Sequence, residues 1–283
     1  MSQIGAAEPG WQTAVARLRG LGDRLERRVG AARFRSIAVG VTGGLIVSVA
    51  GIAVIGFSTK GWAIDFGADF LGYLTATRTW LETGAFYLPR QLHGAYQIEL
   101  GDVLYPPNAL WILVPFTVLP ALLWWVIPLG ITTFVIVGWR PSVYWWPLMA
   151  AGLAYPDSSY MLLRGTPTIW LVAAVAAGLR WRWPGALVLL KPSLLPFALI
   201  GVRSRGWWIA IGVLAVATMP LLGMVPDWLA AVMDGQGKSG LLYSAKDLPI
   251  VSILVFAWLG RTRLRQAGCR PIRSCPPSSL PRT

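Results

Sequence analysis

Charged residues are scarce in this sequence of 283 residues. Charged residues make up 13% of the chain, against about 25% in a typical soluble domain. Hydrophobic residues make up 55%, and the mean hydropathy is +0.57. This balance excludes an ordinary soluble enzyme and a disordered protein. It is typical of a multi-pass membrane protein, and the sixteen tryptophans agree because Trp concentrates at membrane–water interfaces.

Cysteine and histidine are also scarce. The two cysteines, Cys269 and Cys275, both lie near the C-terminus, and His93 is the single histidine. These counts exclude a disulfide framework and a metal site built on repeated Cys or His spacing. The sequence also lacks the HExxH, P-loop and GxGxxG motifs. We therefore expect neither a metal nor an organic cofactor.

Acidic residues are few at both ends of the chain. Residues 1–35 carry seven arginines and three acids, and residues 261–283 carry six arginines and no acid. The positive-inside rule predicts that both termini are cytoplasmic. Basic residues that keep both ends on the cytoplasmic side and attract anionic lipids then account for the net charge of +13. We therefore do not expect nucleic acid as a partner. We divide the chain into a basic segment (1–35), a membrane domain (36–260) and a basic, Pro/Ser-rich tail expected to be disordered (261–283).

Long apolar runs fill the middle of the chain. The first, Ser36 to Ser58, has 23 uncharged residues, enough for a helix to cross roughly 30 Å of hydrocarbon. Further apolar stretches cover 106–139, 142–155, 166–179, 184–202, 207–225 and 248–260. Arginines without nearby acids separate several of them, whereas most acids lie in the loops 59–105 and 226–247. The sequence therefore predicts an all-α, polytopic helical bundle in the cell membrane, with those two loops outside.

Two of these stretches predict broken helices. The 184–202 segment has arginines on both flanks and Lys191-Pro192 near its middle. Because Pro disfavours helix at and before its own position, we interpret this segment as a re-entrant hairpin with Lys191 near its apex. The alternative is one crossing with a snorkelling lysine. In 106–139 the three prolines favour a half-inserted piece followed by one crossing.

The 59–105 loop contains an amphipathic helix at the outer membrane surface, with Asp69 at its start and Gly84 at its end. Its apolar face is formed by Phe70, Tyr73, Leu74, Thr77, Trp80 and Leu81. Asp69 is either a helix N-cap or a carboxylate that accepts a proton in the outer cleft. Asp65 is the alternative carboxylate. His93 is either a proton-transfer partner or an ordinary solvated side chain.

Lys191 is the cation most indicative of function. A charge near the bilayer centre costs at least ~2.5–3.5 kcal/mol, so such a residue is a functional candidate by default. A lipid phosphate is a suitable partner for it. Arg164 is a second candidate for the same anion, with an ordinary surface charge as its alternative. Tyr105-Pro106-Pro107 opens the next apolar stretch, where two prolines also suit a simple helix start.

Several short motifs occur in a characteristic order over residues 60–260. They are Asp69-Phe70-x-x-Tyr73-x-x-Ala76 with Gly84 and Tyr87, Tyr105-Pro106-Pro107 with Leu119-Pro120, and Leu190-Lys191-Pro192 followed by Arg203 and Arg205. Together they resemble the motifs of bacterial polyprenol-phosphate-mannose-dependent α-1,2-mannosyltransferases, integral-membrane glycosyltransferases of the GT-C class. Arg164-Gly165-Thr166 departs from the pattern, since members often have Gly-Gln there.

The resemblance implies a hexosyltransferase of cell-envelope glycolipid biosynthesis. Its donor would be a polyprenyl-phosphate sugar, its acceptor a lipid or glycan, and its reaction would take place on the extracytoplasmic side. Asp69 would be the catalytic carboxylate, while Tyr73, Tyr105, Lys191, Arg164 and His93 would contribute to binding the donor or acceptor.

One further departure concerns the end of the chain. Members of that family usually run longer, with additional spans after the position of residue 260, so the resemblance predicts a C-terminally truncated chain. A second class of function also stays open, that of a non-enzymatic membrane protein that binds or transports lipids. A transporter would place polar groups near the bilayer midplane, whereas here the acids cluster in the outer loops.

Overall fold

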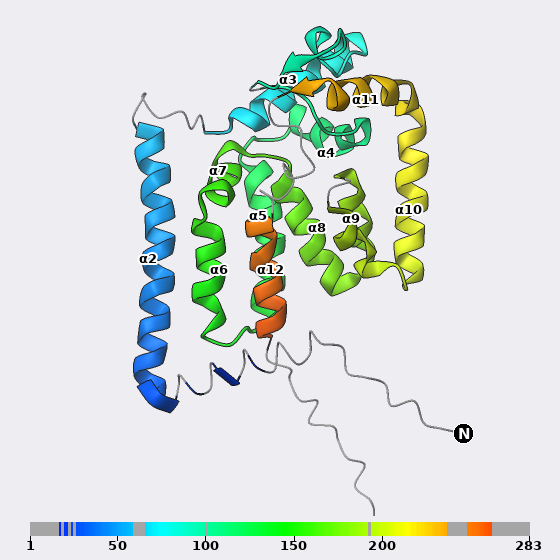
Figure 1. The fold of residues 1–283 in the computed structure, drawn as a ribbon. Coiled ribbons are helices and arrows are strands. Elements are labelled where there is room, and N and C mark those ends of the chain that lie inside the picture. The colour runs from blue at the N-terminus through cyan, green and yellow to red at the C-terminus, as the bar shows by residue number, and fades with distance from the viewer. Residues whose placement is uncertain are drawn as a thin grey trace, which may run out of the picture.

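The computed structural model describes residues 17, 20, 21, 24, 27–58, 66–99, 101–191, 194–236 and 248–261. These residues are predominantly helical, as the sequence predicts. Figure 1 shows most helices running side by side, while α3 (Ala68–Thr83) and α11 (Val225–Met233) lie crosswise at one end of the bundle. Asp65 and residues 262–283, which are all but the first residue of the tail expected to be disordered, lie outside the described part of the chain.

The first long helix, α2, covers Ala31–Ser58 and so begins before the predicted apolar run. It stands at the edge of the bundle and contacts α6 (Trp145–Ala154). Most of its described side chains are exposed, including Val39 and Val47. Such an exposed apolar helix suits contact with lipid rather than water.

The buried centre of the bundle is formed by α5 (Leu123–Trp139), α8 (Thr168–Trp181) and α12 (Leu248–Gly260). Nearly every residue of α8 from Thr168 to Gly178 is buried. Four of these are alanines, and such small residues let helices approach each other closely. This core carries α7 (Pro156–Arg164), which precedes α8 at a 105° bend.

By length and composition, two described segments are candidate membrane spans, Ala31–Gly51 and Arg205–Met233. The second combines α10 (Arg205–Thr218), η7 (Met219–Met224) and α11. If the bent pair α7–α8 is one span, the number of candidate spans is three. The apolar helices α5 and α12 are shorter, with 17 and 13 residues. The chain thus has two or three helices long and apolar enough to cross a membrane, while the larger predicted number of crossings stays a prediction.

The 184–202 stretch has the shape of a hairpin. Its first arm is the 3₁₀ segment η4 (Trp183–Leu190), and its second arm is α9 (Leu195–Ala198) with η6 (Leu199–Gly201). The two arms contact each other. A methyl group at Gly201 would collide with the carbonyl oxygen of Arg182, so the two ends of the hairpin are in contact. This confirms the predicted hairpin, whereas its place within a membrane stays a prediction.

The 106–139 stretch is also broken as predicted. It begins with three short pieces, η2 (Pro107–Ala109), α4 (Leu110–Leu113) and η3 (Val114–Thr117), and only then enters the longer helix α5. Pro115 lies near the start of η3, and a proline cannot donate the backbone hydrogen bond that would extend a regular helix.

The helix predicted within the 59–105 loop, called the outer loop below after its predicted side, is confirmed as α3, and Gly84 ends it with a φ of 81°. Its place at the outer membrane surface stays a prediction. Phe70, Leu74 and Thr77 of the predicted face are buried, but Leu81 is 53% exposed, so the face is shorter than predicted. The rest of the loop contains η1 (Pro89–Gln91) and a two-residue strand, β1 (Tyr96–Gln97). This strand pairs in parallel with β2 (Gly235–Gln236), directly after α11.

Charges separate along the bundle. The described acids lie in α3, the outer loop, the start of α7, and α11 with the residue after it. Arg78, Arg90 and Arg164 lie at the same end as the acids, whereas the arginines without nearby acids lie at the opposite end, where α5 and α8 end, α10 begins and α12 ends. Pro141 forms a bridge with Arg261 there. The arrangement agrees with the charge pattern from which the topology was predicted.

Candidate functional site

Asp69 lies in the first turn of α3, but it is not the N-cap. The N-cap is Gly67, whose φ of 73° is in the left-handed region and which makes no side-chain cap bond. The Gly67 amide donates to the carbonyl of Leu163 in α7, at 2.9 Å. The N-cap interpretation of Asp69 is therefore wrong. Because the helix begins after Gly67, Asp69 is the second residue of α3, and its carboxylate is available for contacts with other segments.

Both oxygens of the Asp69 carboxylate are engaged. Arg164 Nη2 lies 2.8 Å from Oδ1 in an ion pair, and Thr166 Oγ1 donates to Oδ2 at 2.7 Å. The side chains are 23% exposed for Asp69 and 11% exposed for Arg164. The contact joins the start of α3 to the bend between α7 and α8, two segments almost a hundred residues apart in sequence.

The bend itself is fixed by tight packing. Gly165 has a φ of 69°, and a methyl group there would lie 2.6 Å from the Trp125 ring. The indole of Trp124 donates to the Gly165 carbonyl at 2.7 Å, and that of Trp125 donates to the Leu162 carbonyl at 2.8 Å. Glycine is required here by both its backbone angle and its surroundings. The bend therefore holds Arg164 and Thr166 in place on either side of it.

A second polar cluster surrounds Thr168, the fully buried first residue of α8. Lys191 Nζ donates to its hydroxyl at 3.1 Å, and the Tyr105 hydroxyl lies 3.1 Å from the same oxygen. Lys191 Nζ also lies 5.6 Å from the centre of the Tyr105 ring. The Tyr73 ring packs edge-on against Tyr105 at 5.5 Å.

The two clusters belong to one region because Thr166 and Thr168 are two residues apart. Asp69 and Arg164 meet at the first, and Tyr105 and Lys191 at the second. The start of α8 adds the partial positive charge of a helix N-terminus. The site thus combines a carboxylate, a guanidinium, an ammonium and hydroxyl groups, which suits binding of a phosphate beside a proton acceptor.

The two threonines were not found from the sequence. Both lie close to Arg164, in the segment Arg164-Gly165-Thr166-Pro167-Thr168. Isolated hydroxyl residues, however, form no periodic sequence pattern that would mark them as functional. His93 was expected near this site, yet it is an exposed residue whose ring contacts the Pro89 carbonyl of its own loop. Within the described residues, no group of three His, Cys, Asp or Glu side chains is arranged to hold a metal ion.

The site is closely packed. The cavity beside it is lined by Tyr105, Trp124 and Leu190 among others and has a volume of about 10 Å³, the size of about one water. This cavity is too small for a sugar or a phosphate, whereas the Asp69 side chain is partly exposed.

The outer loop is connected to the site through Tyr87, whose hydroxyl donates to the Tyr105 carbonyl at 2.9 Å. Burial raises the pKa of Tyr87, and the negative charge of Asp227 raises it further. The phenol therefore stays protonated at neutral pH and keeps donating. This bond lets the outer loop fix the backbone position of Tyr105.

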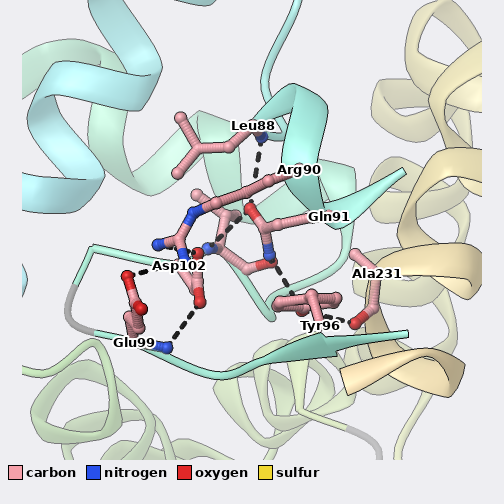
Figure 2. Close-up of polar contacts among 8 residues, drawn as sticks. Leu88, Arg90, Gln91, Tyr96, Glu99, Asp102 and Ala231 are labelled. Atoms are coloured by element: carbon pink, nitrogen blue, oxygen red, sulfur yellow. Dashed lines mark hydrogen bonds and ion pairs between the residues drawn. The ribbon is translucent and has the colours of Figure 1, made fainter. Parts of the chain in front are cut away.

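Buried polar contacts hold the outer loop in shape (Figure 2). The fully buried Gln91 side chain accepts from the Leu88 and Val103 amides and donates to the Val103 carbonyl and the Tyr96 hydroxyl. Tyr96 in turn donates to the Ala231 carbonyl of α11, at 2.6 Å. Each buried group is satisfied by a partner, as a stable polar network requires.

A second contact closes the same loop. Arg90 pairs with Glu99 at 2.7 Å and with Asp102 Oδ1 at 2.8 Å, the latter as an ion pair without hydrogen-bond geometry. Asp102 Oδ2 accepts from the Glu99 amide at 2.7 Å. The Asp102 side chain is fully buried, so this pair is screened less by solvent than the exposed one with Glu99.

We expect Gln91→Leu to loosen the outer loop and to lower the free energy of unfolding by at least about 2 kcal/mol, because it leaves several buried backbone groups without partners. Thermal unfolding of the purified protein in detergent, with limited proteolysis of residues 85–105, measures the effect. Gln97→Leu is the matched control, since it changes an exposed amide of the same loop. Equal effects of the two substitutions would contradict the role of Gln91.

Comparison with known proteins adds no identification. No family model, no curated protein and no solved structure matches the chain.

Proposed function

We propose that this chain is an integral-membrane glycosyltransferase of the GT-C type. It transfers a hexose, mannose by the resemblance, from a polyprenyl-phosphate donor to a lipid or glycan acceptor on the extracytoplasmic side. The supporting observation is a pair of polar clusters near the start of α8, one joining Asp69 to Arg164 and one joining Tyr105 and Lys191 through Thr168. A bundle held together by apolar packing alone does not need a carboxylate and two cations at one place.

The proposed reaction uses these groups in separate roles. Asp69 accepts the proton of the acceptor hydroxyl as that oxygen forms a bond to the anomeric carbon. The bond between this carbon and the phosphate oxygen breaks, and the polyprenyl phosphate leaves with the electron pair. Lys191 and Arg164 stabilise the developing negative charge, because fixed cations in a water-poor site interact strongly with it.

Purified protein in detergent or vesicles, given a polyprenyl-phosphate mannose donor and a glycolipid acceptor, tests the proposal. Transfer of labelled mannose to the acceptor supports it. The alternative, a lipid-binding or transport protein, would bind the polyprenyl phosphate without transferring sugar. Absence of transfer despite binding would therefore favour that alternative.

The proposed orientation places both termini in the cytoplasm and the α3 end of the bundle outside. In a variant with Cys269 and Cys275 replaced by serine, a cysteine at Met233, which is 79% exposed beside the outer loop, is expected to react with an impermeant reagent in intact cells. A cysteine at the exposed Arg203 is expected to react only after the cells are opened. External labelling at position 203 would overturn this topology.

A further inference from the structure

The ion pair between Arg164 and Asp69 has a consequence for the proposed reaction. A general base needs a lone pair facing the hydroxyl it deprotonates, yet here Arg164 and Thr166 contact one carboxylate oxygen each. Each oxygen still has a second lone pair, but a hydroxyl that approaches Oδ1 on the side of the guanidinium must displace Arg164 before it can pass its proton to that oxygen.

Arg164 is the donor better suited to leave. Its side chain is 11% exposed, and its Nε is buried without a hydrogen-bond partner among the described residues. Its other contacts are to Tyr160: the guanidinium donates a hydrogen bond to the Tyr160 hydroxyl, and its Cζ lies 4.8 Å from the centre of the Tyr160 ring. A buried unsatisfied donor is costly, and a phosphate offers several oxygens in the geometry that a guanidinium prefers.

The surroundings of Arg164 also favour an anion. Thr166 and Thr168 lie two and four residues after it in sequence. Lys191 donates to the Thr168 hydroxyl, and α8 begins there with the partial positive charge of a helix N-terminus. Asp69 is the described carboxylate that pairs with Arg164. A phosphate bound in this region would therefore compete with Asp69 for the same guanidinium.

We infer that the Arg164–Asp69 ion pair is a latch on the proposed base, which the phosphate of the donor opens. This inference rests on the proposed function. Without donor, Arg164 holds the carboxylate. With donor, Arg164 turns to the phosphate and Asp69 becomes free for the acceptor hydroxyl. The latch thus links deprotonation of the acceptor hydroxyl to the presence of donor.

If the latch exists, Asp69→Asn is expected to bind phosphate more tightly than the natural chain does, although the same substitution is expected to impair catalysis. Removing the carboxylate removes the competitor for Arg164, so affinity for a short-chain polyprenyl phosphate is expected to rise at least about fivefold, the lower edge of typical coupling between sites. Calorimetric titration of the purified full chain, with inorganic phosphate as a second probe, measures this without any turnover.

The mechanism requires Arg164, and a double-mutant cycle tests that requirement. Arg164→Gln is expected to bind the probe more weakly than the natural chain. Adding Asp69→Asn to Arg164→Gln is expected to bring no gain. Glu82→Gln, which removes an exposed acid from the same helix, is the matched control and is expected to leave affinity unchanged. Arg164→Met replaces Arg164→Gln if the latter fails to fold.

The outcomes separate the latch from the function. A gain that persists without Arg164 would reduce the effect to general charge repulsion and overturn the latch. Binding by the natural chain with no gain in Asp69→Asn would overturn the latch alone. No binding of either probe by the natural chain or by Asp69→Asn would overturn both the latch and the proposed function.

Discussion

Replacement of Asp69 by asparagine is expected to leave a folded protein whose sugar-transfer rate has fallen at least about a hundredfold, as is typical when a general base is removed. Asparagine has nearly the same shape and its oxygen still accepts a hydrogen bond from Thr166 or Arg164. It cannot accept a proton at neutral pH. The measurement is initial-rate transfer of labelled sugar at saturating donor, with unfolding temperature recorded on the same sample.

The controls for this prediction follow from the contacts of Asp69. Arg164→Gln breaks the same ion pair but keeps the carboxylate, so it reveals how much stability the pair supplies. Because both side chains are mostly buried, that loss exceeds the ~0–1 kcal/mol of an exposed pair. Asp65→Asn tests the alternative carboxylate and is expected to affect the rate far less. Full activity in Asp69→Asn, or a larger loss in Asp65→Asn, would show that Asp69 is not the base.

Much of the fold was predictable because it depends on patterns close together in the sequence. The apolar spacing after Asp69 predicted α3, and Gly84 predicted where it ends. Arginines on both sides of 184–202, with Pro192 between them, predicted a hairpin whose ends are in contact. In each case the local backbone preference and the burial of apolar surface favour the same structure. Contacts between distant segments therefore did not change the locally preferred conformation.

The contacts of the site were less predictable because they join distant segments. Asp69 seemed suited to capping α3, but Gly67 adopts the left-handed turn and hydrogen-bonds to Leu163, which no local pattern encodes. Thr166 and Thr168 became recognisable only once the α7–α8 bend placed them against Asp69 and Lys191. His93 shows the converse case: it was singled out because it is the single histidine, and its contact lies within its own loop, as the solvated alternative expects.

Two of the predicted site residues, Lys191 and Asp69, share the property that each is unusual for its surroundings. Lys191 is a charge within an apolar stretch, and Asp69 is an acid just after the first long span. A membrane environment makes such residues costly, so they persist where a partner or a function compensates. The structure provides the partner of each, Thr168 for Lys191 and Arg164 for Asp69. An unusual residue of this kind therefore marks a member of the site but not the residue with which it pairs.

Lys191→Met is expected to weaken binding of a polyprenyl-phosphate donor at least about tenfold while the protein stays folded. A charged hydrogen bond contributes about 1.5–3 kcal/mol, and 1.4 kcal/mol corresponds to about a tenfold change in affinity. Methionine is similar in length and apolar. Replacing a partly buried cation by such a side chain removes its desolvation cost, so folding is expected to be preserved. Titration of the purified variant with donor measures affinity separately from turnover.

Thr168→Val separates the position of the ammonium from its charge. It removes the hydroxyl that contacts both Lys191 and Tyr105 but keeps the cation and the shape of the side chain. We expect a smaller loss of donor affinity than in Lys191→Met, because the charge remains near the phosphate although it is less well oriented. If Lys191→Met binds donor as tightly as the natural chain while Thr168→Val does not, the hydroxyls rather than the lysine hold the phosphate, and Lys191 has no part in the donor site.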